Sequence, residues 1–222
     1  MAIKLKRSQI LKLTSEEFEN MTENDIDEMA IPSYRHKNPI IRWLMWRRYE
    51  CIAKLSKFSG DMAVMEFGCG IGLFLPELNN SCGKVYAIDL FPYYAKLLCK
   101  RMNLDVQFLS DVIELPDNHL SIIIAADVLE HLDDLNEYLT LFREKLGKKG
   151  RLIISGPTEN IIYKIGRIIA GFGDKGDYHH RNIDQIIKTI EEEGFNQNKT
   201  ITLPFRIPPF LFKVCEFVIK DK

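Results

Sequence analysis

The middle of the chain alternates between short apolar runs and longer stretches in which apolar residues recur at helical spacing. The apolar runs predict strands at residues 63–67, 84–89, 106–109, 121–126 and 151–155. The helical spacing predicts helices near residues 72–80, 91–102 and 134–147. Continuous apolar runs joined by helices are typical of parallel strands that are covered on both faces. The pattern therefore predicts an α/β fold with a doubly wound, Rossmann-like sheet.

The C-terminal part of the chain adds a helix and a pair of strands. Apolar spacing predicts the helix over residues 183–193, and Gly194 ends it. Residues 195–203 and 210–219 are apolar-rich segments of the kind that form a finishing strand pair. With the strands before them, they predict a sheet of about seven strands.

The N-terminal part predicts helices without strands. Residues 14–28 hold seven acids and no base and begin with a capping sequence, which indicates a solvated helix. Asn38 and Pro39 are typical of the first residues of a helix, and the spacing beyond them predicts one from about residue 39 to residue 58. We therefore divide the chain into a helical N-terminal cap, residues 1–60, and a main domain with the C-terminal strand pair, residues 61–222.

The charges of the chain nearly balance, which excludes some classes of protein. Thirty Lys and Arg against 31 Asp and Glu give a net charge of −1, so the sequence argues against a nucleic-acid partner. No charge-free run exceeds ten residues, whereas a membrane-spanning helix needs about 20. The five cysteines contain no C-x-x-C pair and predict reduced thiols in a cytoplasmic protein.

Residues 64–72 (VMEFGCGIG) carry the main candidate chemistry, a strand that runs into a glycine-rich turn. Glycines at alternate positions let the backbone approach a ligand without Cβ collisions, although they also permit close packing of a strand and a helix. Asp89 ends the next strand, where a carboxylate can accept hydrogen bonds from both hydroxyls of a ribose. The final glycine of a dinucleotide fingerprint is missing, which argues against NAD. The segment therefore predicts a nucleoside site.

These motifs resemble those of the class I S-adenosylmethionine-dependent methyltransferases, in particular the small-molecule group that includes quinone-biosynthesis enzymes. Residues 66–72 are similar to the first motif of the family and residues 87–90 to the second. Residues 109–112, 125–132 and 150–157 correspond to the third motif, the fourth motif and the strand that follows. Because the motifs occur in order over about residues 60–200, the resemblance implies S-adenosyl-L-methionine as the cofactor.

The resemblance also implies a role for each motif residue. The methionine part of the cofactor would lie on Glu66, Gly68, Cys69, Gly70 and Gly72. Asp89 would hold the ribose. The adenine would contact Asp111 through its amino group and Leu90 and Val112 through its ring, and Ala126 would begin the floor where methyl donor and acceptor meet. Asp111 has an alternative role as a turn or helix cap.

Histidines supply candidates for a general base. Methyl transfer from a sulfonium needs alignment and exclusion of water, and a base assists only when the acceptor is a hydroxyl. His179 and His180 follow a glycine-rich segment between the fifth strand and the next helix, and we predict them as catalytic residues. The alternative is that they form a helix-capping pair on the surface.

A metal ion is an alternative that the sequence leaves open. Asp127, Glu130 and His131 fall within one turn, and with His179 or His180 they would make a set of oxygen and nitrogen ligands for a divalent ion. Some quinone O-methyltransferases resemble this pattern with glutamate in the first position, and the same Glu-His pair occurs in metal-free relatives. Our prediction is a site without a metal.

The segments outside the motifs are expected to choose the acceptor. Residues 203–219 hold four phenylalanines and the bases Arg206 and Lys213, so we predict a small, apolar or lipid-like acceptor and weak peripheral contact with a membrane through this tail and the helix at residues 35–48. The alternative for this tail is an edge hairpin that packs its phenylalanines inward. Two other functions are an RNA methyltransferase and a non-catalytic, nucleoside-binding regulatory protein.

Overall fold

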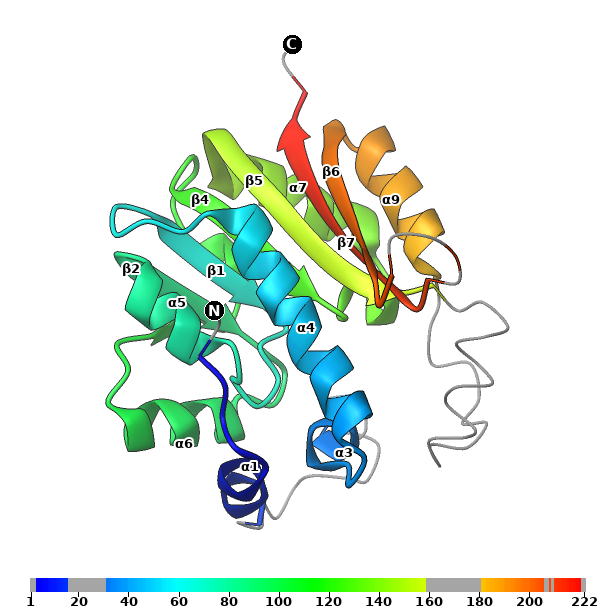
Figure 1. Ribbon diagram of the computed structural model, residues 1–222. Coiled ribbons are helices and arrows are strands. Elements are labelled where there is room, and N and C mark those ends of the chain that lie inside the picture. Colours follow the sequence, from blue (N-terminus) through cyan, green and yellow to red (C-terminus); the bar gives the residue numbers. More distant parts are fainter. Residues whose placement is uncertain (1–2, 16–30, 159–180, 206–207, 209, 221–222) are drawn as a thin grey trace.

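The computed structural model describes residues 3–15, 31–158, 181–205, 208 and 210–220, which form a seven-stranded sheet between layers of helices (Figure 1). The strands are β1 Ala63–Phe67, β2 Lys84–Ile88, β3 Gln107–Phe108, β4 Leu120–Ala126, β5 Leu146–Pro157, β6 Phe195–Leu203 and β7 Phe212–Ile219. The α-helices are α1 Arg7–Leu13, α3 Ile31–Arg35, α4 Pro39–Ser56, α5 Leu75–Ser81, α6 Tyr93–Met102, α7 Leu135–Lys145 and α9 Ile183–Glu192. Two short 3₁₀ turns are η1 Val112–Glu114 and η2 Leu129–His131.

The strands lie in the order β3-β2-β1-β4-β5-β7-β6. The first five strands of the chain pair in parallel, and β7 inserts antiparallel between β5 and β6. The order reverses direction between β1 and β4, which makes the carboxyl ends of these strands the place where such sheets bind ligands. The predicted fold class, including the C-terminal strand pair, is confirmed.

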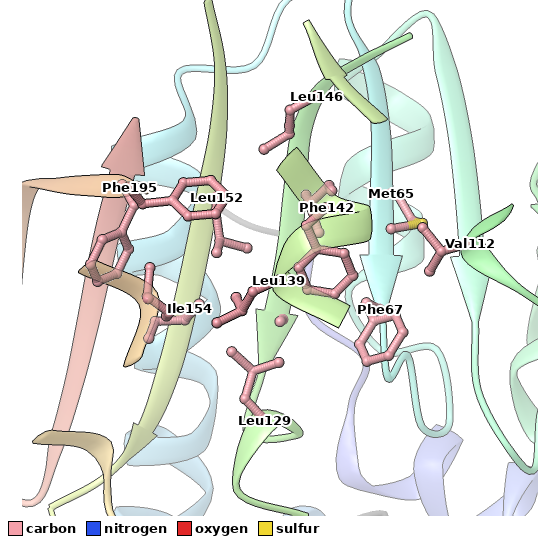
Figure 2. Packing of buried hydrophobic residues seen from close by; sticks show 14 of the residues in the cluster. Met65, Phe67, Val112, Leu129, Leu139, Phe142, Leu146, Leu152, Ile154 and Phe195 are labelled. Atoms are coloured by element: carbon pink, nitrogen blue, oxygen red, sulfur yellow. The ribbon is translucent and has the colours of Figure 1, made fainter. Parts of the chain in front are cut away.

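Alternate residues of each strand face two different cores, because successive side chains point to opposite faces of a sheet. Met65 and Phe67 of β1 pack under Leu139 and Phe142 of α7 (Figure 2). Val64 of the same strand belongs to the opposite core, which α4, α5 and α6 cover. Burial on both faces explains why the sequence shows continuous apolar runs in these strands.

Helix α4 runs antiparallel to the central strands. Its N-cap is the Asn38 side chain, which accepts a hydrogen bond from the Ile40 amide at 2.9 Å. Arg151 of β5 donates to the carbonyl of Leu55 at 3.0 Å, near the end of the helix. Arg48, seven residues earlier, forms an ion pair with Asp127, which follows β4. The first half of α4 therefore extends past the carboxyl ends of the strands, where it joins α1 and α3 (Figure 1).

Some predicted boundaries are wrong. The helix predicted to begin at Thr14 does not start there, because Thr14 ends α1 and its amide donates to the carbonyl of Ile10; residues 16–28 lie outside the described part. Helix α4 ends at Ser56 and not at Phe58, since Lys57 adopts a left-handed backbone with φ +47°. No helix among the described residues is long and apolar enough to cross a bilayer.

Candidate functional site

The glycine-rich turn after β1 lies at the carboxyl edge of the sheet, beside the segment that follows β4. Gly68, Gly70 and Gly72 have φ angles of +74°, +52° and +75°, a region that favours glycine. A Cβ atom on Gly68 would lie 2.5 Å from Cγ2 of Val128. The turn therefore requires glycine for its backbone conformation and, at Gly68, for close approach to the β4 side of the site.

Asp89 connects this turn to the end of β2 through hydrogen bonds. Its Oδ2 accepts a hydrogen bond from the Gly70 amide at 2.6 Å, and its Oδ1 accepts one from the Phe91 amide at 2.8 Å. Burial raises the pKa of Asp89 above its ordinary value, and the two amides act in the opposite direction. The next side chain, Leu90, is 88% exposed. The second predicted motif thus supplies an anchored carboxylate beside an uncovered apolar surface.

The segment after β3 holds two residues that were predicted to contact the adenine. Asp111 accepts a hydrogen bond from the Ile113 amide at 2.9 Å and caps η1, as its alternative role anticipated. Val112 is 1% exposed and packs in the core beside Met65 (Figure 2). Its contact with an adenine ring stays a prediction, and because the side chain is buried that contact would come from the backbone. Ile113, which the sequence reading missed, is 66% exposed beside Asp111.

Glu66 ends up buried without a partner. It is 1% exposed, and neither carboxylate oxygen has a hydrogen-bond partner among the described residues. Burial, with the negative charge of Asp89, raises the pKa of Glu66 well above its ordinary value. Cys69 is also buried, and burial raises the pKa of its thiol, so its contribution to the turn comes from its backbone. Its amide donates to the carbonyl of Ile88 at 3.0 Å.

The β4 side of the site contains an ion pair that the sequence reading missed. Asp127 has φ +55°, unusual for a residue other than glycine, and its carboxylate pairs with Arg48 of α4. Asp127 Oδ1 also accepts a hydrogen bond from the Ser155 hydroxyl at 3.0 Å. The Arg48 guanidinium lies 4.8 Å from the centre of the Phe212 ring. Residues from α4, β5 and β7 thus meet beside Ala126, which is half-buried at the end of β4.

A signal for Arg48 exists in the sequence. It lies three residues after Met45 and four and seven residues before Ile52 and Leu55, on the face of the helix that carries the apolar residues. A base on such a face is expected to be buried against a charge or a ring. In the structure Arg48 is 5% exposed.

Two other predictions concern the general base and a metal ion. His179 and His180 lie outside the described residues. Within the described part, no group of three His, Cys, Asp or Glu side chains is arranged to hold a metal ion. Asp127 instead has Arg48 and Ser155 as partners, and Glu130 is 2% exposed.

Comparison with known proteins identifies the family. A model described as "Methyltransferase domain" matches residues 43–196, most of the chain. The chain belongs to this methyltransferase family. The predicted recognition is confirmed at the level of this family, and the resemblance to it implied S-adenosylmethionine as the cofactor.

Curated relatives match a shorter part of this methyltransferase. Ubiquinone biosynthesis O-methyltransferases of two Rickettsia bellii strains are 28% identical over 100 residues. The match covers 43% of this chain and 42% of the length of those relatives.

Solved structures share the fold at low identity. An S-adenosylmethionine-dependent methyltransferase from Aquifex aeolicus is 21% identical with a TM-score of 0.61, over 97% of this chain and 100% of that one. The N-methyltransferase NodS from Bradyrhizobium japonicum, crystallised with S-adenosylhomocysteine, is 18% identical with a TM-score of 0.66, over 90% of this chain and 98% of that one. The shared fold extends to the N-terminal part of this methyltransferase.

The residues at the carboxyl edge fit the cofactor. Gly68 lets Val128 approach the turn more closely than a Cβ atom would permit, and Asp89 presents a carboxylate of the type that binds ribose hydroxyls. The unpaired carboxylate of Glu66 is suited to a cationic group. An α-ammonium, a ribose and an adenine are three of the polar parts of S-adenosylmethionine.

Proposed function

We propose that this methyltransferase transfers the methyl group of S-adenosylmethionine to a small acceptor of apolar, lipid-like character. The observation that carries the proposal is the Phe212 ring, which lies under Arg48 on the β4 side of the site, opposite the nucleoside side. Val128 adds a second apolar side chain there, against Gly68. The names of the curated relatives, which refer to ubiquinone biosynthesis, are compatible with such an acceptor.

The cofactor residues follow from the edge described above. Asp89 binds the ribose, and the backbone of Gly68, Cys69, Gly70 and Gly72 follows the methionine part. Leu90 and Ile113 offer exposed apolar surface to the adenine ring, with Asp111 at its amino group. Val112 contributes through its backbone, and Ala126 borders the acceptor. These assignments are supported by the order in which the positions follow one another along the carboxyl edge of the sheet, from β3 to β4.

The chemistry needs few reacting groups from the protein. The bound sulfonium supplies an activated methyl group, whose displacement requires an acceptor atom in line and the exclusion of water. Arg48, Asp127 and Ser155 hold one another, which makes the wall on the acceptor side rigid. His179 and His180 remain our proposed bases for a hydroxyl acceptor.

Membrane contact is proposed at α4 in preference to the tail. Phe212 is 7% exposed and Phe217 is fully buried, so neither ring reaches a membrane surface, which favours the packed hairpin. On α4, Ile40 is 68% exposed and Trp43 is 49% exposed. Exposed apolar side chains near an exposed base such as Lys37 favour weak, salt-sensitive contact with an anionic membrane.

Transfer of a labelled methyl group tests the proposed acceptor. The protein is incubated with methyl-labelled S-adenosylmethionine and a cell extract, and label is counted separately in the organic and aqueous phases. We expect label in the organic phase, and Asp89→Ala provides the control for transfer at this site. Label confined to the aqueous phase would exclude a lipid-like acceptor. Cofactor binding without any S-adenosylhomocysteine formation would favour the non-catalytic alternative.

A further inference from the structure

The turn that follows β4 carries a sequence pattern that suits a metal ion. Asp127, Glu130 and His131 supply two carboxylates and an imidazole within one turn. A metal ion requires such side chains to converge on one point with lone pairs available to it. Among the residues that the structure describes, no three side chains of this kind converge, and Glu130 is 2% exposed. The described residues therefore do not fit a metal ion, and the partners of Asp127 show why.

Both carboxylate oxygens of Asp127 have partners from neighbouring elements. Oδ2 forms an ion pair with Nη1 of Arg48 on α4, and Oδ1 accepts a hydrogen bond from the Ser155 hydroxyl on β5 at 3.0 Å. The Asp127 amide also donates to the carbonyl of Ser155 at 2.9 Å. These contacts hold Asp127 in its left-handed backbone conformation, φ +55°. A cation of the protein thus lies where a metal ion would bind this carboxylate.

The guanidinium of Arg48 is fixed at this position. It lies 4.8 Å from the centre of the Phe212 ring, a distance at which the face of the ring attracts a cation. The Arg48 side chain is 6% exposed and that of Asp127 is 19% exposed, and a buried charge is stable only when it is paired. A divalent ion on Asp127 would lie beside the guanidinium, where little water screens the repulsion. The positive charge at Asp127 therefore belongs to the chain.

Asp127 lies between the two sides of the site. Ala126 precedes it at the end of β4, and Val128 follows it and packs against Gly68, where a Cβ atom would lie 2.5 Å from Cγ2 of Val128. The ion pair therefore joins α4 to the segment that meets the glycine-rich turn. Methyl transfer requires donor and acceptor to lie in line, so a displacement of this segment would lower the rate more than it lowers cofactor affinity.

We propose that the guanidinium of Arg48 takes the place of a divalent metal ion at Asp127 and positions the Asp127–Val128 segment for a methyl transfer that needs no metal. Arg48 acts through Asp127 and is a positioning residue. An arginine makes this link a permanent part of the fold, whereas a metal ion would exchange with solvent. The effect on the rate rests on the proposed methyl transfer, but the ion pair itself can be tested without an acceptor.

Thermal melting of the ligand-free protein tests the ion pair. Asp127→Asn keeps the shape and tolerates the left-handed backbone but leaves the buried guanidinium unpaired, so Tm should fall by about 6 °C or more. Arg48→Met in the same chain removes the unpaired charge and should recover part of this loss. As a control, Glu192→Gln breaks an exposed ion pair with Lys188 and should leave Tm unchanged. Losses that simply add in the double variant would show independent side chains and overturn the proposal.

Chelation and titration with Mn²⁺ test the independence from metal. The wild-type protein should transfer label from methyl-labelled S-adenosylmethionine to a cell extract at the same rate with excess EDTA as with added Mn²⁺. Calorimetric titration of the metal-free protein with Mn²⁺ should show no saturable binding. Transfer that EDTA abolishes and Mn²⁺ restores, or saturable Mn²⁺ binding that Asp127→Asn removes, would overturn the proposal. A wild-type protein that transfers no label at all would contradict the proposed function, and melting would then decide the ion pair.

The rate and the cofactor affinity together separate positioning from a purely structural role. Asp127→Asn should lower the rate of transfer about tenfold or more, while the affinity for S-adenosylhomocysteine changes by less than about twofold. Arg48→Lys keeps the charge for Asp127 and should retain more of the wild-type rate than Arg48→Met. Equal losses of rate and affinity in Asp127→Asn, or equal rates in the two Arg48 variants, would contradict the positioning role.

Discussion

Replacing Glu66 by glutamine should stabilise the ligand-free protein and weaken its affinity for the cofactor. Glu66 is 1% exposed and its carboxylate has no hydrogen-bond partner among the described residues. Burial raises its pKa well above the ordinary value of 4.5. The folded state therefore binds more protons than the unfolded state above that value, and the free energy of unfolding falls as pH rises through the raised pKa. Glutamine has nearly the same shape and removes this loss.

The magnitude follows from the unpaired carboxylate. A buried charged group without a partner costs about 1–3 kcal/mol or more, so Glu66→Gln should raise the free energy of unfolding by about that amount at neutral pH. In a domain of this size each kcal/mol corresponds to about 2–4 °C in Tm. The gain should vanish as pH falls below the unfolded pKa, where both proteins carry a neutral side chain.

Two measurements on the same pair of proteins test this reasoning. Calorimetric melting of the ligand-free proteins from pH 4 to pH 8 gives the stability difference, and titration with S-adenosylhomocysteine gives the affinity. We expect the variant to melt higher above the unfolded pKa and to bind the ligand at least tenfold more weakly, because an amide lacks the charge that an ammonium requires. A variant no more stable than the wild type at pH 8 would refute the account of burial. Unchanged affinity would refute the role of Glu66 in binding the α-ammonium of the ligand.

The other predictions concern the turn, the bases and the membrane. Asp89→Ala should weaken S-adenosylmethionine binding tenfold or more in calorimetry, because it loses the ribose contacts as well as the 2.6 Å bond to the Gly70 amide, and an unchanged affinity would mean that the pocket is misassigned. Gly68→Ala should abolish cofactor binding, because the added Cβ atom would lie 2.5 Å from Val128. Val128→Ala in the same chain should not restore cofactor binding fully, since the +74° φ angle remains strained. His179→Ala or His180→Ala should lower kcat with near-normal cofactor affinity if the acceptor is a hydroxyl; activity unchanged in both would exclude these residues as bases. Replacing Ile40 and Trp43 together by serine should reduce flotation with anionic vesicles at low salt, whereas Ile113→Ser should not, and equal binding by all three proteins would exclude α4 as the contact.

The central sheet could be predicted from the sequence because its strands are buried on both faces. Strand β1 matches its predicted bounds, since both Val64 and Met65 must be apolar to face opposite cores. The cap was harder to predict. Helices α1 and α3 have seven and five residues, too short to show a clear period, and they depend on packing against Ile71 and Leu73.

The residues of the site also divide into those that could be predicted from the sequence and those that could not. Asp89 and the glycines were predictable because their positions relative to the strands define their chemistry. The exposure of Ile113 could not be predicted, because η1 turns the chain so that Val112 enters the core and Ile113 faces solvent, and three residues of sequence do not determine which of the two is buried. Arg48 was missed because its partners Asp127 and Phe212 are distant in the sequence and meet it only through the fold.

A crystal structure with S-adenosylhomocysteine would show whether the carboxyl edge of the sheet is the cofactor site. We expect the ribose hydroxyls on Asp89, the adenine between Leu90 and Ile113, and the α-ammonium beside Glu66. A ligand bound elsewhere, or bound here with its ribose away from Asp89, would contradict the claim that this carboxyl edge is the cofactor site.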